Sequence, residues 1–300
     1  MDGCVKVVIS GTAGAFPECE NVAEFEKALD RKAFLITDDD RKWKTSKNSK
    51  PLYYGNAFGS DKFDATFFNV HFQYPPAMDP ITRKGLETAV EAIIDAGVSP
   101  KSLAGSNTAV LTSYDLSEME SSFAYFRASR VFAGVARTMS ANRLSFSLHL
   151  HGPSLSYTGG WAALFHLLEN SREQLQSGAI DAAIIVCSNF IMTRQSMMCY
   201  SHLGMTAPDG KCRPFDMNGQ GYARSDGCVA FFLQREPDAR RNWATLIASD
   251  YRFFKTERAN VLTFDTKNAI NLLEEMYTKH DINPAKVEYV EADGSGLKVG

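Results

Sequence analysis

Short apolar runs of strand composition alternate along this chain with longer segments of helical spacing. Residues 182–187 form an uninterrupted apolar run, the pattern of a strand that is buried on both faces. Residues 79–96 place their apolar side chains on one helical face, with Pro80 in the first turn and Gly97 after the last. Strands separated by helices favour an α/β protein whose largely parallel sheet is covered by helices on both faces.

The remaining elements are read from the same two periodicities. Strands are expected at residues 5–10, 108–112, 145–150, 228–233, 246–251 and 287–291, and helices at residues 22–29, 132–144, 161–175 and 269–277. Residues 37–75 are polar and aromatic with scattered glycine and proline, which indicates long surface connections.

Composition narrows the classes of partner and compartment. The chain has 300 residues, 44% of them apolar, and a net charge of −3. This balance gives no electrostatic reason to expect a nucleic-acid partner, and no apolar stretch is long enough for a membrane span. Six cysteines without CxxC spacing favour a reducing compartment. With no signal peptide at the start, we expect a cytoplasmic protein, although secretion by another route stays open. No cofactor or metal is expected.

The stretch GPSLSYTGGWAALFHLL, residues 152–168, has the pattern of a strand, a tight turn and a helix. Such a turn often presents a nucleophile at the start of its helix. Here the residue at that point is Trp161, whose indole cannot act as a nucleophile. The stretch therefore raises the question of whether it is an active site or a site that has lost its chemistry.

Long motifs, in order along the whole chain, resemble one family. They are TDDDRKWK (37–44), FDATFFNV (63–70), MDPITRKGLETAVEAIIDAG (78–97), ANRLSFSLHLHGPSL (141–155), SGAIDAAIIV (177–186), GMTAPDGKCRPFDMNGQGYARSDGCVAFFL (204–233) and VEYVEADGSGLKVG (287–300). With these motifs the chain resembles the N-terminal part of the β-ketoacyl synthase domain of animal-type fatty acid synthases.

The resemblance implies a thiolase-like fold, built in the family from two similar halves. Residues 1–254 are expected to form the complete N-terminal half, with a mixed, mostly parallel, five-stranded sheet. Residues 255–300 would be the truncated beginning of the C-terminal half, one helix and one strand, packed with the rest as a single domain. Two subunits normally pair across the first half of the family fold. A homodimer is therefore expected, in which the strand at 182–187 pairs across the two-fold axis.

The resemblance also implies what active members do: a cysteine at a helix N-terminus takes an acyl chain, and two histidines assist decarboxylative condensation. Counted from Gly152-Pro153-Ser154, the cysteine position holds Trp161, and the first histidine position holds Asp293. The second histidine, a supporting lysine and the oxyanion-hole loop lie later in the family than this chain extends. We therefore expect a pseudoenzyme, with the bulky indole filling the acyl cavity.

Several readings stay open beside this one. Gly159 and Gly160 could leave an anion-binding helix start, or could only relieve crowding around Trp161. Ser154 could serve a changed activity such as an esterase or other hydrolase, although no G-x-S-x-G elbow is present. His149 and His151 could form a metal pair, but no third ligand is evident.

Two further clusters are interpreted as structural. Arg224 and Asp226 are expected to form an internal ion pair, and the basic residues at 41–44 are expected to form a solvated loop face.

For a pseudoenzyme the expected function is a binding or structural one, either a dimeric protein–protein interaction module or a carrier of an apolar or acyl ligand. The chain could also be a fragment of a larger synthase-like polypeptide.

Overall fold

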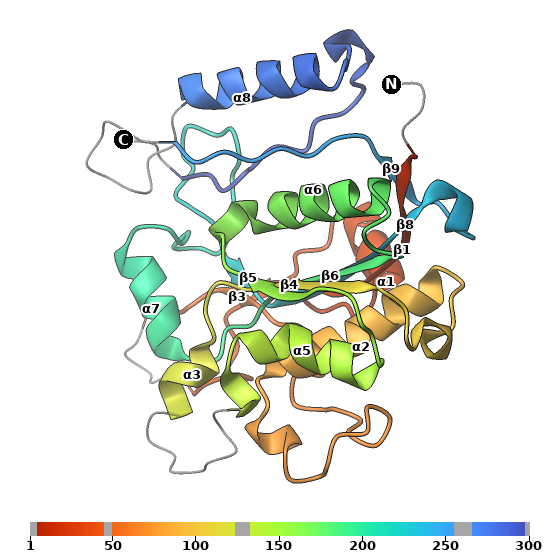
Figure 1. The fold of residues 1–300 in the computed structure, drawn as a ribbon. Helices are drawn as coiled ribbons and strands as arrows, with labels where there is room; N and C mark the ends of the chain where they lie inside the picture. The colour runs from red at the N-terminus through yellow and green to blue at the C-terminus, as the bar shows by residue number, and fades with distance from the viewer. Residues whose placement is uncertain (1–4, 45–49, 124–132, 255–265, 298–300) are drawn as a thin grey trace.

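The fold is a layered α/β arrangement around one six-stranded sheet (Figure 1). A computed structural model describes residues 5–44, 50–123, 133–254 and 266–297. Its helices are α1 (Val22–Asp30), α2 (Pro80–Asp95), α3 (Glu118–Phe123), α5 (Thr138–Ser147), α6 (Ala163–Gln176), α7 (Arg194–His202) and α8 (Thr266–Lys279). Its strands are β1 (Val7–Ala15), β2 (Ile36–Thr37), β3 (Tyr54–Gly55), β4 (Ala109–Ser113), β5 (Ser154–Tyr157), β6 (Ala183–Asn189), β7 (Arg224–Ser225), β8 (Gly227–Arg235) and β9 (Ala244–Leu246).

The sheet is mixed, as expected, but the expectation of five mostly parallel strands is wrong. Its order is β5-β4-β6-β8-β1-β9. The β4–β5 and β4–β6 pairings are parallel, whereas β6–β8, β8–β1 and β1–β9 are antiparallel. In the antiparallel part, β8 runs opposite to both β6 and β1, with Val7 of β1 facing Arg235 of β8. A second sheet, β2-β3-β7, joins three short strands.

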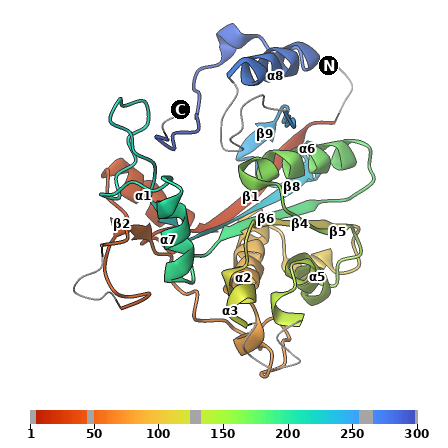
Figure 2. The ribbon, with the colours of Figure 1, turned by 90° about the vertical axis from the view of Figure 1, so that its left-hand side faces the viewer.

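Helices cover both faces of the large sheet. In Figures 1 and 2, α2 and α5 lie on one face and α6 lies on the other, with α8 beyond α6. The side chains of β6 alternate between the two resulting cores: Ile184 and Val186 pack under α2, and Ala183 and Ile185 pack under α6. This confirms that the apolar run at 182–187 is a strand buried on both faces.

The central position of β6 overturns the expected dimer contact. β6 has β4 on one side and β8 on the other, so its backbone has no free edge for a second subunit. The strands at the two ends of the sheet order are β5 and β9.

The α2 helix has the boundaries that its sequence predicts. Asp79 is its N-cap and accepts a hydrogen bond from the backbone N–H of Ile81 at 2.9 Å, with Pro80 in the first turn. The strand expected to end at Gly11 continues through it to Ala15. A Cβ on Gly11 would lie 2.0 Å from the carbonyl oxygen of Ala92, so only glycine lets α2 pack this closely on β1.

Three other expectations differ from the structure. Residues 145–150 are the end of α5 and a turn with Leu148 and Leu150 buried, so their alternation came from a helix end and not from a strand. β9 begins at Ala244, earlier than the strand expected at 246–251. The C-terminal helix is present as α8, but residues 287–291 pair with no strand in the described structure. The boundary expected at 254/255 falls at the edge of residues 255–265, outside the described residues.

No helix in the described ranges combines the length and apolar character needed to cross a bilayer.

Substituting Gly11 with alanine should destabilise the fold, because the new methyl group would overlap the backbone of α2. We expect the free energy of unfolding to fall by about 2 kcal/mol or more, measured by urea denaturation. Gly227→Ala in β8 is the matched control, since a Cβ there has its nearest atom at 3.8 Å. Its effect should stay within about 1 kcal/mol, and equal losses in the two variants would contradict the packing argument.

Candidate functional site

The site is built where β5 turns into α6, next to the ends of β4 and β6. Gly160 begins a 3-10 turn, Gly160–Ala162, which leads directly into α6. Its φ of +60° lies in the left-handed region that favours glycine. The N–H of Gly160 donates to Oδ1 of Asp115 at 3.0 Å, so a carboxylate from the segment after β4 holds the turn.

This contact changes the reading of Gly159 and Gly160. An N–H group at the expected anion-binding helix start is already bonded to a carboxylate of the chain itself. At Gly159 the crowding that a glycine relieves involves Tyr157, because a Cβ there would lie 2.3 Å from the Tyr157 ring. Beyond its own chain neighbours, a Cβ on Gly160 would meet nothing within 4 Å.

Trp161 does not fill the cavity at this point, contrary to expectation. The residue is 65% exposed. It lines a cavity of about 510 Å³ that remains open beside it. The indole replaces the small side chain expected at the start of α6, but it lies along the wall and leaves the space free.

The cavity wall combines aromatic, polar and apolar side chains from five regions of the chain. It is lined by Ser113, Tyr114, Asp115, Leu116, Gly160, Trp161, Ala163, Leu164, Cys187, Ser188, Asn189, Tyr200, Tyr222, Ala223, Arg224, Ser225, Gly227 and Val229. Residues 113–116 and 187–189 lie at the carboxyl ends of the parallel strands β4 and β6. That edge is where open α/β sheets place ligands.

The cavity holds one cysteine, and its thiol is poorly suited to act as a nucleophile. Burial raises the pKa of Cys187 to about 12, and the neighbouring Cys228 adds to the shift. A thiolate is the reactive form of cysteine, so this side chain stays protonated near neutral pH. No histidine is among the residues that line the cavity in the described structure. The wall thus offers neither a thiolate nor an imidazole base.

Asp293 is exposed and does not line the cavity. The segment around it is fixed by backbone contacts: the thiol of Cys212 donates to the carbonyl of Gly294 at 2.8 Å, and the N–H of Gly221 donates to the carbonyl of Gly296 at 3.0 Å. Burial raises the pKa of Tyr222, a cavity residue, and the negative charge of Asp293 is a smaller contribution in the same direction. The segment that carries Asp293 therefore contacts residues 212 and 221, while Asp293 itself lies outside the cavity wall.

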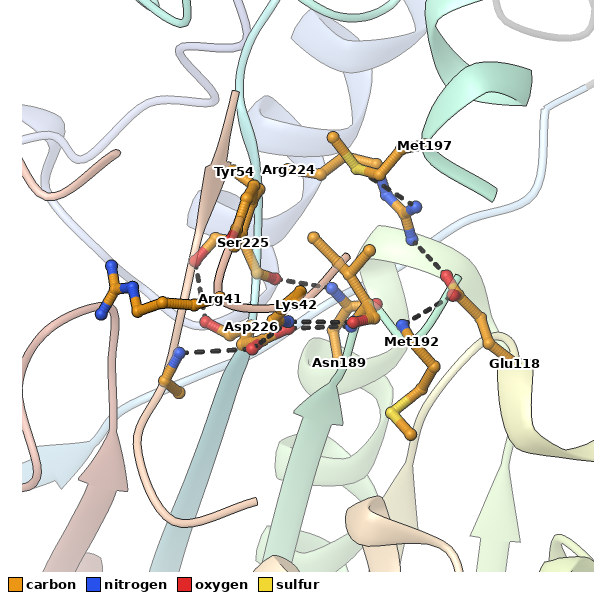
Figure 3. Close-up of polar contacts among 12 residues, drawn as sticks. Arg41, Lys42, Tyr54, Glu118, Asn189, Met192, Met197, Arg224, Ser225 and Asp226 are labelled. Atoms are coloured by element: carbon orange, nitrogen blue, oxygen red, sulfur yellow. Dashed lines mark hydrogen bonds and ion pairs between the residues drawn. The ribbon is translucent and has the colours of Figure 1, made fainter. Parts of the chain in front are cut away.

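Arg224 and Asp226 do not pair with each other, contrary to expectation. Figure 3 shows that each has its own partner from a distant segment. Arg224 pairs with Glu118 at 3.3 Å, and Asp226 pairs with Lys42. Glu118 also accepts the N–H groups of Met192 and Thr193, both at 2.8 Å, at the start of α7.

The Lys42–Asp226 pair lies inside the protein. The Asp226 side chain is fully buried and that of Lys42 is 14% exposed. Asp226 accepts further hydrogen bonds from the N–H groups of Ile191 at 2.8 Å and Ala57 at 3.3 Å. Burial raises the pKa of Asp226 and lowers the pKa of Lys42, and the attraction between the two charges opposes both shifts. The basic segment at 41–44 is therefore only partly a solvated face, because Lys42 turns inward.

The other candidate groups have structural surroundings. The Ser154 hydroxyl donates to Oδ1 of Asn142 at 2.9 Å and accepts from Ser145 at 3.0 Å, and neither an amide nor a hydroxyl is a general base that could activate it. His149 and His151 are exposed and do not lie on a strand. No group of three possible ligands able to hold a metal ion occurs among the residues that the structure describes.

Sequence reasoning missed Asp115, Tyr200 and Tyr222 as cavity residues. Asp115 follows the strand at 108–112 within a few positions, so the rule that sites lie at the carboxyl ends of parallel strands could have found it. Tyr200 lies on α7, which carries no clear helical signal, and Tyr222 lies in a long loop.

Comparison with known proteins gives consistent matches. A family model described as "Beta-ketoacyl synthase, N-terminal domain" matches residues 5–239. A fatty acid synthase from Anser anser anser is 34% identical over 299 residues, covering 98% of this chain and 84% of that protein. A lovastatin diketide synthase from Monascus pilosus is 31% identical over 249 residues, covering 79% of this chain and 10% of that protein.

Solved structures match the fold of the chain. The ketosynthase from module 6 of the bacillaene synthase of Bacillus subtilis 168 superposes with a TM-score of 0.87 at 24% identity, covering 97% of this chain and 51% of that one. The ketosynthase from module 1 of the bacillaene synthase of Bacillus amyloliquefaciens FZB42 gives 0.86 at 20% identity, covering 98% and 55%. The chain thus has the thiolase-like ketosynthase fold over about half the length of these structures.

Removing the charge of Lys42 should be strongly destabilising, because it leaves the buried Asp226 carboxylate without its partner. For Lys42→Met we expect the free energy of unfolding to fall by about 3–5 kcal/mol in urea denaturation. Arg41→Met is the matched control, because the neighbouring Arg41 pairs with Glu18 and Asp39 and its side chain is 41% exposed. The control should lose about 1 kcal/mol or less, and a similar loss at Lys42 would rule out a buried, essential pair.

Proposed function

The chain belongs to the β-ketoacyl synthase family, and from that premise we propose that it is a non-condensing member that acts as a binding protein. In this proposal the protein works as a homodimer with one open cavity in each subunit. The observation that carries it is the composition of the cavity wall. Trp161 lies at the start of α6, and among the residues that the structure describes the wall has a single cysteine, a partly buried thiol with a raised pKa, and no histidine.

The loss of condensation is supported residue by residue. Decarboxylative condensation needs an activated thiolate, which is normally produced by a low pKa at a helix start. Trp161 supplies no such group, and Asp293 offers a carboxylate in place of the imidazole and does not line the cavity. The Asp115 carboxylate bonded to Gly160 would also oppose negative charge at this turn. Because catalytic groups act as a unit, loss of several of them leaves no route to the product.

The homodimer is supported by β5, which within the described residues has a strand neighbour on one side only. An edge strand presents unpaired N–H and C=O groups, and a two-fold axis would let β5 pair antiparallel with its own copy. Apolar side chains surround this edge: Leu155 on β5 is 49% exposed, Phe146 at the end of α5 is 70% exposed, and Phe165 on α6 is 52% exposed. Figure 1 shows α5 and α6 on opposite faces of the sheet that ends in β5.

Incubation with octanoyl-CoA and malonyl-CoA should produce neither an acylated protein nor a condensation product. Intact-protein mass spectrometry would show an unchanged mass, and thiol detection would show CoA release no faster than in buffer. An acyl adduct or CoA release that disappears in Asp293→Ala would contradict the proposal, because it would assign catalysis to the residue at the histidine position.

Introducing a charge on the edge strand should separate the dimer. Wild-type protein is expected to run at twice its 33.2 kDa chain mass in light scattering after size exclusion, whereas Leu155→Asp should run at the single-chain mass. Burying a carboxylate in a two-fold contact places two like charges together, which costs several kcal/mol. Leu29→Asp on α1, at a leucine that is 60% exposed away from β5, is the control and should stay dimeric. A monomeric wild type would refute the dimer.

A further inference from the structure

We infer that the cavity is a binding site for an organic cation, a molecule that joins a protonated amine to a flat apolar group. The inference rests on the proposed function in one respect, that the cavity binds a ligand without transforming it. It goes further in naming the ligand class. That class is opposite in charge to a fatty acid or a malonyl group.

The first step is the charge of the cavity wall. Of the lining residues, Asp115 is acidic and Arg224 is basic. The charge of Arg224 is neutralised inside the protein, because its guanidinium pairs with the buried Glu118 at 3.3 Å. The guanidinium also lies 4.0 Å from the centre of the Tyr200 ring. Asp115 accepts the N–H of Gly160 and forms no ion pair within the described part of the chain. The wall therefore carries an uncompensated negative charge.

That charge disfavours an anionic ligand. A fatty carboxylate would be repelled by Asp115 and would find the N–H of Gly160 occupied. A cation is favoured by the same arrangement, because a charge-assisted hydrogen bond to Asp115 is stronger than a neutral one.

The second step is the aromatic surface of the wall. Trp161 lines the cavity and is 65% exposed, so its indole is available to a ligand. Indole attracts cations through its π face more strongly than the other aromatic rings do. Tyr114 and Tyr222 add further rings to the wall, and their pKa values are raised mainly by burial, so both phenols stay neutral. Flat apolar groups stack well on such surfaces.

The third step is size. A cavity of about 510 Å³ falls within the usual range for small-molecule sites, roughly 300–1,000 Å³. A carboxylate, an indole ring and phenol rings together favour one class of molecule. That class is an amine carried on an aromatic or other flat group.

Isothermal titration calorimetry with three matched probes tests the inference on the full chain. The probes are 2-phenylethylamine, 2-phenylethanol and phenylacetate, which share a ring and differ in charge. We expect the amine to bind about tenfold more tightly than the alcohol, and the carboxylate to bind more weakly than either. Raising the salt concentration should weaken the amine alone, because only its binding depends on charge attraction.

Two variants locate the effect in the cavity. Asp115→Asn keeps an oxygen acceptor for the N–H of Gly160 and should bring the amine to within about twofold of the alcohol. Asp64→Asn is the matched control, since Asp64 is also exposed and accepts the N–H of Phe67 at 2.9 Å, but does not line the cavity. Trp161→Leu keeps apolar contact but removes the π face, so it should weaken the amine more than the alcohol.

The outcomes separate this inference from the proposed function. Unchanged binding of the alcohol to Asp115→Asn shows that the variant is folded. Equal affinities for the three probes, tighter binding of phenylacetate, or no heat with the amine at millimolar concentration would each overturn the inference. None of these results would restore acyl transfer, so the thioester and dimer experiments would still decide the proposed function.

Discussion

Four buried or nearly buried charges determine how distant segments assemble beside the cavity. Arg224 and Asp226, two residues apart, each bind an opposite charge far away in sequence, Glu118 and Lys42. Glu118 also accepts a hydrogen bond from a backbone N–H at the start of α7, and Asp226 accepts one from the N–H of Ile191. A buried charge without its partner is very costly, so the cavity wall, α7 and the second sheet keep one arrangement relative to one another.

The scaffold and the chemistry of this family have separated in this chain. The scaffold is held by α2 on one face of the sheet, α6 on the other, and Gly11 where α2 meets β1. Under the proposed function, the chemistry of the family would have depended on a few side chains at the edge of the sheet. Trp161, at that edge, is 65% exposed and belongs to neither core, so its identity is free to change without loss of the fold.

The parts of the fold that local patterns encode were predictable, and the parts that long-range pairing decides were not. The boundaries of α2 follow from Asp79, Pro80 and an apolar face, which are all local. The antiparallel pairing of β1 with β8 brings Val7 opposite Arg235, a contact between residues far apart in the sequence that no periodicity reveals.

The candidate site divides in the same way. The place of the site at the start of α6 could be read from the turn motif, and Trp161 was found there. The open space beside the indole could not be foreseen, because rotamer and exposure depend on neighbours from other segments. The partners of Arg224 and Asp226 were missed for the same reason, since Glu118 and Lys42 approach only in the folded chain.

The hydrogen bond between Asp115 and Gly160 also has an evolutionary consequence. A cysteine introduced at position 161 would lie next to a carboxylate that disfavours its thiolate. Under the proposed function, a return to acyl chemistry would therefore require a change at Asp115 as well as at Trp161.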